Sequence, residues 1–209
     1  MKNITKFTNT VQLSPGKTYF QSLSTGVCGY INSPSWVDRP IGIYDDLTSF
    51  LQLIDMVESP EITIKDQYIE INGVETNIKY RYCDPSLCGE SQTVANIIET
   101  TPDDFELIHE GTLSKQLLQF LKNSTALSDA DIITYNQNIV VQSSEIDKLL
   151  LSKPNIFFND LGEFVSSYEF VKLPLKDYNF KTYYNKTRNR IRLSLYDDDI
   201  FVMVSLVGR

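Results

Sequence analysis

The sequence predicts an α+β protein built from two similar domains. Runs that alternate apolar and polar residues, as strands do, occur in each half beside runs with helical three- and four-residue spacing. The two halves present these elements in a similar order, which indicates an internal duplication. Between them, residues 83–104 contain two prolines, a glycine and many small polar residues, a composition typical of a linker.

These observations place a domain boundary near residue 103 of the 209-residue chain. Domain 1 is predicted over residues 1–103, including a connector over about residues 84–103. Domain 2 is predicted over residues 104–209. Each domain then has about 100 residues, a usual size for an independently folding unit.

The first half is expected to open with a short amphipathic helix. Ile4 and Phe7 are three residues apart, and Lys2 and Lys6 are four apart, so the two pairs lie on different faces. The main helix follows Asp45 or Asp46 as its cap and ends before Pro60. Strands are expected at residues 11–13, within 19–31, and at 61–65, 68–71 and 76–82.

The second half repeats this order. Its main helix has Leu113, Leu117, Phe120 and Leu121 on one side. Asn136–Asn138 supplies the turn of a hairpin, because asparagine tolerates left-handed backbone geometry. Strands are expected at residues 105–109, 132–135, 139–142, about 155–173, 180–184, 190–196 and 200–207, with a short helical turn at 174–178.

The charge distribution restricts the kind of nucleic-acid partner. The formal net charge is −8, which argues against a protein that coats nucleic acid over its whole surface. The charge is uneven, however: residues 1–110 carry −9 and residues 111–209 carry +1. A chain of this kind can still concentrate lysines on one face.

The residue counts favour a protein without catalytic chemistry. The single histidine, His109, ends a predicted strand, and we expect an ordinary structural role. Cys28, Cys83 and Cys88 would complete a zinc set with it, but Cys28 lies in a separate apolar segment. We therefore expect no metal, no cofactor, and free thiols in a reducing compartment. Asp197–Asp199 is expected to be a turn, since consecutive strand residues seldom converge on one ion.

Lysines recur on the predicted polar helix faces. Lys115 and Lys122 are seven residues apart, so two helical turns return them to one face. With Lys2 and Lys6 they form basic faces opposite apolar ones. Any single helix can carry such lysines as solvated surface, but their repetition in an acidic chain favours a functional interpretation.

The densest basic segment is residues 172–192, which hold 7 of the 19 basic residues, interleaved with tyrosines. Such a segment can bind single-stranded nucleic acid through phosphate contacts and stacking. On a strand, Lys186, Arg188, Arg190 and Arg192 would also point to one face and protect a hairpin edge by charge. Both interpretations remain open. No apolar stretch is long enough to span a membrane, and no membrane partner is expected.

In residues 41–54, an Ile-Tyr-Asp strand end precedes a helix with Phe-Leu in its second turn. This strand-into-helix segment resembles one in the sliding clamps of T-even-type tailed bacteriophages. The hairpin at 61–71 and the run 78–86, with its Asp-Pro-Ser end, follow at similar spacing. Residues 113–121 resemble the opening of the family's second domain, and residues 178–181 resemble part of its close.

The resemblance implies a ring of three identical subunits around duplex DNA, with antiparallel sheets outside and helices on the inner face. It implies a DNA polymerase processivity factor without enzymatic activity, an ATP-dependent clamp loader as a partner, and the cytoplasm of an infected bacterial host. A sliding ring offsets phosphate charge without base readout. The implied DNA-facing residues are Lys2, Lys6, Lys115, Lys122 and Lys176. The polymerase is implied to dock a short apolar tail beside the connector, where Ile97 and Ile98 are the candidates.

Two alternatives compete with this interpretation. One is a single-stranded nucleic-acid-binding protein that uses the basic segment 172–192. The other is a non-enzymatic structural protein of a phage, with no role at DNA.

Overall fold

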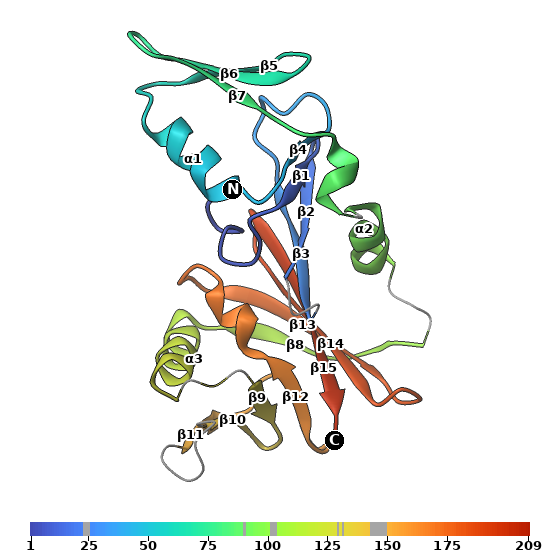
Figure 1. Ribbon diagram of the computed structural model, residues 1–209. Coiled ribbons are helices and arrows are strands. Elements are labelled where there is room, and N and C mark those ends of the chain that lie inside the picture. Colours follow the sequence, from blue (N-terminus) through green and yellow to red (C-terminus); the bar gives the residue numbers. More distant parts are fainter. Residues whose placement is uncertain (23–25, 90, 101–103, 129, 131, 143–149) are drawn as a thin grey trace. The chain divides into compact units, whose positions relative to one another are not determined.

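The computed structural model has the predicted α+β character, with strands predominating over helices. It describes residues 1–22, 26–89, 91–100, 104–128, 130, 132–142 and 150–209. The chain divides into two compact units (Figure 1). Unit 1 is Met1–Leu23 with Tyr30–Ile97, and unit 2 is Ser24–Gly29 with Ile98–Arg209. The sequence did not predict that Ser24–Gly29 belongs to unit 2. The domain boundary at residue 103 stays a prediction.

Unit 1 contains three groups of paired strands. β1 pairs antiparallel with β4, β2 pairs with β3, and β5, β6 and β7 form an antiparallel meander. The predicted strands are confirmed here to within a few residues, and β4 forms at the start of the segment 41–54. The strands are β1 (Val11–Leu13), β2 (Lys17–Gln21), β3 (Val27–Asn32), β4 (Ile41–Ile43), β5 (Glu61–Ile64), β6 (Tyr68–Asn72) and β7 (Asn77–Arg81).

The main helix of unit 1 is α1 (Leu47–Asp55). Asp46 occupies its N-cap position, within the predicted choice, but its carboxylate accepts a hydrogen bond from the Tyr80 hydroxyl at 3.0 Å. The first turn is satisfied instead by Asn9, whose Oδ1 accepts from the Thr48 backbone N–H at 2.9 Å. The cap therefore comes from a distant segment, which local spacing does not reveal.

The predicted N-terminal helix is wrong. Residues 2–7 form hydrogen-bonded turns, in which the Ile4 N–H donates to the Met1 carbonyl and the Phe7 N–H to the Ile4 carbonyl. Ile4 and Phe7 are buried as a pair, as their spacing predicts. A segment this short cannot offset the cost of helix nucleation, so tertiary packing decides its form.

The predicted connector contains more regular structure than its composition indicates. Asp84 caps the 3₁₀ helix η1 (Pro85–Cys88), and α2 (Ser91–Glu99) follows. Val94 and Ala95 of α2 are buried. Small polar residues have weak helix propensity, but this burial overrides it.

Unit 2 is organised around a wide sheet. Its strand order is β11-β10-β9-β12-β15-β14-β13-β8, and β3 also pairs with β15. The strands are β8 (Glu106–Leu113), β9 (Ile132–Tyr135), β10 (Asn138–Gln142), β11 (Leu150–Pro154), β12 (Phe164–Ser167), β13 (Tyr178–Asn185), β14 (Arg190–Tyr196) and β15 (Ile200–Gly208).

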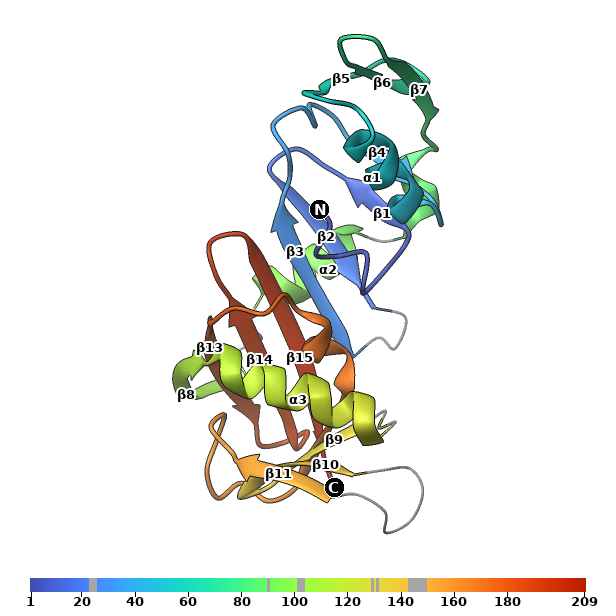
Figure 2. The ribbon, with the colours of Figure 1, turned by 90° about the vertical axis from the view of Figure 1, so that its left-hand side faces the viewer.

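Helix α3 (Lys115–Ser128) lies across one face of this sheet, over β13, β14 and β15 (Figure 2). Two residues of the helix, Leu118 and Leu121, are fully buried. The predicted stripe is partly wrong, because Leu117 and Phe120 are half-exposed. No helix of the described residues is both long enough and apolar enough to cross a membrane.

Two predictions for residues 155–178 are wrong. Of the strands expected over about 155–173, only β12 forms, and the 3₁₀ helix η2 (Tyr168–Lys172) follows it. The helical turn expected at 174–178 is an irregular loop, in which the Pro174 carbonyl accepts from the Lys176 N–H. Ser167 caps η2 by accepting from the Glu169 N–H, so the helical turn begins earlier than proline placement predicts.

Candidate functional site

The predicted lysines of unit 1 lie on the N-terminal turns. The Lys2 ammonium is 2.7 Å from the carboxylate of Asp55, at the end of α1, and both side chains are largely exposed. Lys6 is exposed. In the part of the chain that the structure describes, Lys6 forms no ion pair, so its charge remains open to solvent or to a polyanion.

The two lysines of α3 differ in their contacts. Lys115 is exposed, and its backbone N–H donates to Oδ1 of Asp177 at 2.6 Å. A carboxylate at a helix N-terminus is favoured by the helix dipole. The Lys122 ammonium donates to the carbonyl oxygen of Leu173 at 2.5 Å. Both contacts bind the loop 173–177 alongside the first turns of α3.

Lys176, on that loop, is held by two carboxylates. Its ammonium pairs with Asp197 and lies 3.4 Å from Asp199, and it sits 5.7 Å from the centre of the Tyr178 ring. Burial opposes ionisation of Asp197, but hydrogen bonds from Lys176 and from two backbone N–H groups keep the pKa of its carboxyl below the usual value. Burial likewise lowers the pKa of Lys176, and the hydrogen bonds and charges of the two aspartates outweigh it and raise that pKa.

The structure thus brings Lys115, Lys122 and Lys176 together around one loop of unit 2, while Lys2 and Lys6 belong to unit 1. Asp197–Asp199 forms the turn that the sequence predicts, with the Asp199 N–H donating to Asp197. Among the described residues, no group of three or more histidine, cysteine, aspartate or glutamate side chains is placed to hold a metal ion.

The basic segment 172–192 does not form one strand face. Lys186 and Arg188 lie in the turn between β13 and β14, which corrects their predicted placement on a strand. Lys172 pairs with Glu169 at 3.1 Å, and Arg188 lies 3.7 Å from Asp104. The Arg192 guanidinium donates to the Thr100 carbonyl and stacks on Phe105. The basic residues of segment 172–192 are thus spread over a 3₁₀ helix, a loop, two strands and a turn, and several of them have acidic partners.

The two partner-site candidates lie on α2. Ile97 is 40% exposed and Ile98 is half-buried. Neither lines the cavity described next, and their role as a partner site stays a prediction.

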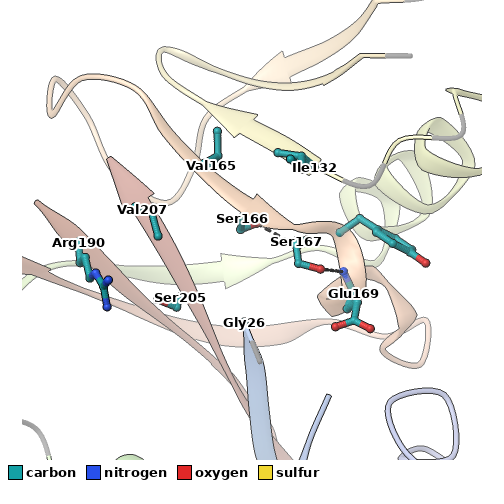
Figure 3. Close-up of a pocket in the computed structure, with 10 residues that line it drawn as sticks. Gly26, Ile132, Val165, Ser166, Ser167, Glu169, Arg190, Ser205 and Val207 are labelled. Atoms are coloured by element: carbon teal, nitrogen blue, oxygen red, sulfur yellow. Dashed lines mark hydrogen bonds between the residues drawn. The ribbon is translucent and has the colours of Figure 1, made fainter. Parts of the chain in front are cut away.

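A cavity of about 630 Å³ opens in unit 2, where the sheet divides (Figure 3). β12 pairs with β15 only through Phe164 and Val165 and then continues along β9. The backbone of β15 turns to Gly26 instead, where the Ser205 N–H donates to the Gly26 carbonyl at 2.9 Å. The two strands therefore separate, and the gap between them forms the cavity.

The more exposed lining side chains of β12 and β15 face away from the buried side of the sheet. Along β12, Phe164 and Ser166 are buried while Val165 and Ser167 are half-exposed, as expected where successive residues alternate faces. Ser166 holds the buried side by its hydrogen bond with the Tyr135 hydroxyl at 3.0 Å. The cavity accordingly opens on the face opposite the core.

The cavity combines an apolar wall with charged ends. Ile132 and Val207, which form part of the apolar wall, are 50% and 44% exposed. Figure 3 shows Arg190 at one side and Glu169 at the other. Glu169 is nearly buried and paired with Lys172. Concave surfaces with apolar walls and a few polar groups are typical of ligand and peptide sites.

Sequence reasoning missed this cavity. Its lining comes from five separate segments, around Gly26, Ile132, β12 with η2, Arg190 and β15. The one local signal is the short alternation Phe164–Ser167, which indicates a strand with one wet face but not what lies beside it.

Comparison with solved structures identifies the fold. A. fulgidus PCNA, in a structure with the C-terminal region of FEN-1, matches with a TM-score of 0.60 and 12% identity, over 100% of this chain and 92% of that one. The PCNA2–PCNA3 complex of Sulfolobus tokodaii matches with a TM-score of 0.61 and 11% identity, over 98% and 93%. The DNA polymerase sliding clamp of Bacillus subtilis matches with a TM-score of 0.61 and 11% identity, over 100% and 61%.

The chain thus spans nearly the full length of the PCNA chains and about three fifths of the bacterial clamp. No protein-family model and no curated protein matches the sequence. At this level of identity the likeness concerns the fold alone. The α+β chain has the sliding-clamp fold, which confirms that part of the resemblance.

Proposed function

We propose that this chain is the subunit of a sliding clamp that encircles duplex DNA and tethers the replicative DNA polymerase. The observation that carries the proposal is the sliding-clamp fold over the whole chain. A ring holds DNA by its topology and needs neither a tight binding patch nor a catalytic group. The proposed protein is therefore a processivity factor and not an enzyme.

The proposed ring is a homotrimer of two-domain subunits, with sheets outside and helices inside. Lys2, Lys6, Lys115, Lys122 and Lys176 are the proposed channel lysines. Exposed Lys6 and Lys115 are best suited to offset phosphate charge, while Lys176 is already held by two carboxylates. Loose, sequence-independent phosphate contacts permit sliding. By the same proposal, an ATP-dependent loader opens the ring, and the protein acts in the cytoplasm of a bacterium infected by a T-even-type phage.

The cavity of unit 2 is a second part of the proposal. The A. fulgidus PCNA structure holds the C-terminal region of FEN-1, so a protein of this fold can bind a partner's terminal segment. We place an apolar side chain of the polymerase tail against Ile132, Val165 and Val207. Ile97 and Ile98 on the connector remain further candidates for contact with that tail.

A topological retention experiment tests the ring. A linear duplex is attached to a bead at one end, incubated with the protein, and closed at the other end with streptavidin. A ring that has threaded onto the duplex stays through a wash at high salt, because screening removes phosphate contacts but not topology. Cutting the duplex should then release the protein. A size measurement in solution should give three times the 23.9 kDa of one chain.

The other outcomes separate the alternatives. Loss at high salt whether or not the ends are blocked would contradict the clamp and favour an electrostatic nucleic-acid binder. Absence of retention at any salt, with a mass of one chain at every concentration, would favour a structural protein without a role at DNA.

The cavity is tested separately with Ile132→Glu and Val207→Glu. Each should abolish stimulation of the cognate polymerase in primer extension while leaving retention on blocked duplex intact. Val74→Glu is the matched control, since Val74 is 90% exposed between β6 and β7 and lies outside the cavity. Unchanged stimulation by the cavity variants would exclude this site.

A further inference from the structure

Two cysteines of unit 1 lie in contact. The sulfur atoms of Cys83 and Cys88 are 3.6 Å apart, and both residues are half-buried. The third cysteine, Cys28, is buried in unit 2. The close pair therefore differs from the isolated thiol in both distance and exposure.

The fold builds this pair from three local features. Cys83 forms an isolated antiparallel bridge with Gly42 of β4, with N–H to carbonyl distances of 2.9 and 3.1 Å. Asp84 then accepts from the Ser86 N–H at 2.9 Å and starts η1, which returns the chain so that Cys88 faces Cys83.

Gly42 provides the space for both sulfur atoms. A Cβ at this position would lie 2.6 Å from the sulfur of Cys83 and 2.8 Å from that of Cys88, closer than real contacts allow. The two sulfur atoms thus occupy space that a side chain at position 42 would fill.

Each thiol borders a hollow of unit 1. Cys83 lines a cavity of about 430 Å³ together with Asp66 and Arg81, and Cys88 lines a smaller one of about 140 Å³. The larger cavity admits a small molecule to Cys83, and its charged lining residues are Arg81, Asp66 and Asp84. Accessible thiols are the ones that undergo exchange.

We propose that Cys83 and Cys88 form a redox-modification site, at which a small disulfide such as oxidised glutathione converts the two thiols into an intramolecular disulfide. The inference does not depend on the proposed clamp function. Disulfides in reducing compartments are usually transient and redox-sensing, and a reversible pair of this kind fits that pattern.

The exchange balances in two steps. The Cys83 thiolate attacks one sulfur of oxidised glutathione, forms a mixed disulfide and expels one glutathione thiolate. The Cys88 thiolate then attacks the Cys83 sulfur and expels the second. Two protein thiols are oxidised, the glutathione disulfide is reduced to two thiols, and the protons of Cys83 and Cys88 pass to solvent and the leaving thiolates.

Access assigns the order, because Cys83 lines the larger cavity, of about 430 Å³, and Cys88 only the smaller one, of about 140 Å³. Burial and the neighbouring Cys83 raise the pKa of the Cys88 thiol to about 12. Once Cys83 is in a mixed disulfide, its hydrogen bond and charge no longer oppose ionisation of Cys88. Cys83 is thus the attacking thiol and Cys88 the resolving one.

Mass spectrometry of the full chain provides the test. The purified protein is equilibrated with graded ratios of reduced to oxidised glutathione, quenched in acid, alkylated and digested with trypsin. No lysine or arginine lies between Arg81 and Lys115, so Cys83 and Cys88 share the peptide 82–115. Under oxidising ratios we expect this peptide to lose the mass of two hydrogens and to resist alkylation, while the peptide with Cys28 stays alkylated.

Single substitutions provide the controls. Cys88→Ser should stop at a stable glutathione adduct on Cys83, and Cys28→Ser should leave the oxidation of the pair unchanged. Full alkylation of peptide 82–115 at ratios that oxidise a reference dithiol peptide would overturn the proposal. A persistent glutathione adduct in the unmodified chain, or simultaneous loss of all three thiols, would also overturn it.

Discussion

The predicted lysines of the two units are held in different ways. In unit 1, Lys2 meets Asp55 across two exposed side chains, and Lys6 extends into solvent. In unit 2, the partly buried Lys176 pairs with Asp197 and lies beside exposed Asp199, while Lys115 is exposed at the start of α3. Both predicted lysines of unit 1 are therefore exposed, whereas unit 2 holds Lys176 by carboxylates and Lys122 by the Leu173 carbonyl and leaves only Lys115 of its three exposed.

This difference shows that a lysine at helical spacing can do two unrelated things. A partly buried, hydrogen-bonded ammonium stabilises the loop that carries it. An exposed ammonium contributes positive charge to the surface and little to stability. Spacing alone does not distinguish them. Substitution of each kind should separate effects on DNA from effects on stability.

The largest expected effect is on DNA affinity. Replacing Lys6 and Lys115 together by glutamate should weaken binding to a short duplex roughly a hundredfold at about 0.1 M salt, because each lost phosphate contact removes about 0.9 from the slope of log affinity against log salt. Fluorescence anisotropy across a salt series measures both quantities. The matched control replaces Lys186 and Arg188, on the β13–β14 turn, by glutamate. A larger loss in the control would favour the basic segment 172–192 as the nucleic-acid site.

The next effect is on stability. Lys176→Met should lower the free energy of unfolding by about 1–2 kcal/mol, since it leaves the Asp197 carboxylate partly buried without its cation. Denaturant unfolding of both proteins measures the difference. A change below about 0.3 kcal/mol would mean that Asp197 is satisfied by its backbone donors alone.

Acid should remove the same contribution. The folded state holds the pKa of Asp197 below its ordinary value, so this carboxylate stabilises the fold at pH values above the unfolded pKa of about 3.9. The contribution, about 1 kcal/mol, should disappear as the pH falls through the lowered folded pKa. Unfolding curves at successive pH values should show Asp197→Asn less stable than the unmodified chain at neutral pH and converging with it in acid. Parallel curves over the whole range would contradict the assignment.

The smallest effect is expected at Lys2. Lys2→Met removes an ion pair whose side chains are 69% and 50% exposed, and such pairs contribute about 0.5 kcal/mol or less. Denaturant unfolding at low and high salt measures it, and any difference should vanish at high salt. If Lys2→Met lowered the free energy of unfolding as much as Lys176→Met does, the ion pairs of the two units would not differ in their contribution to stability.

The elements that the sequence predicts best are those with long, regular patterns. The meander over residues 61–81 and the strands of residues 178–208 are confirmed to within a few residues, because alternation over several residues leaves few options. The wrong predictions concern short segments. Residues 2–7 and 174–178 have helix-like signals but are too short to propagate, and α2 forms where composition indicates a linker.

The candidate site divides in the same way. Lysine positions can be found from spacing, but Asn9 as the cap of α1, Asp197 as the partner of Lys176 and the cavity between β12 and β15 all join distant segments. No local pattern indicates that β12 leaves β15 after two paired residues. The sequence therefore indicates which residues are charged, but not which distant residues form hydrogen bonds and ion pairs with them.

The sequence by itself determined the α+β class, most strands, the main helix of each half and the acidic balance with its few basic faces. These follow from side-chain periodicity and charge, which act over a few residues. The tertiary structure alone decided which lysines stay exposed, where the sheet opens into a cavity, and that Cys83 meets Cys88 above Gly42. Those outcomes depend on strand pairing between segments far apart in the chain, and pairing is settled by the packing of the whole unit.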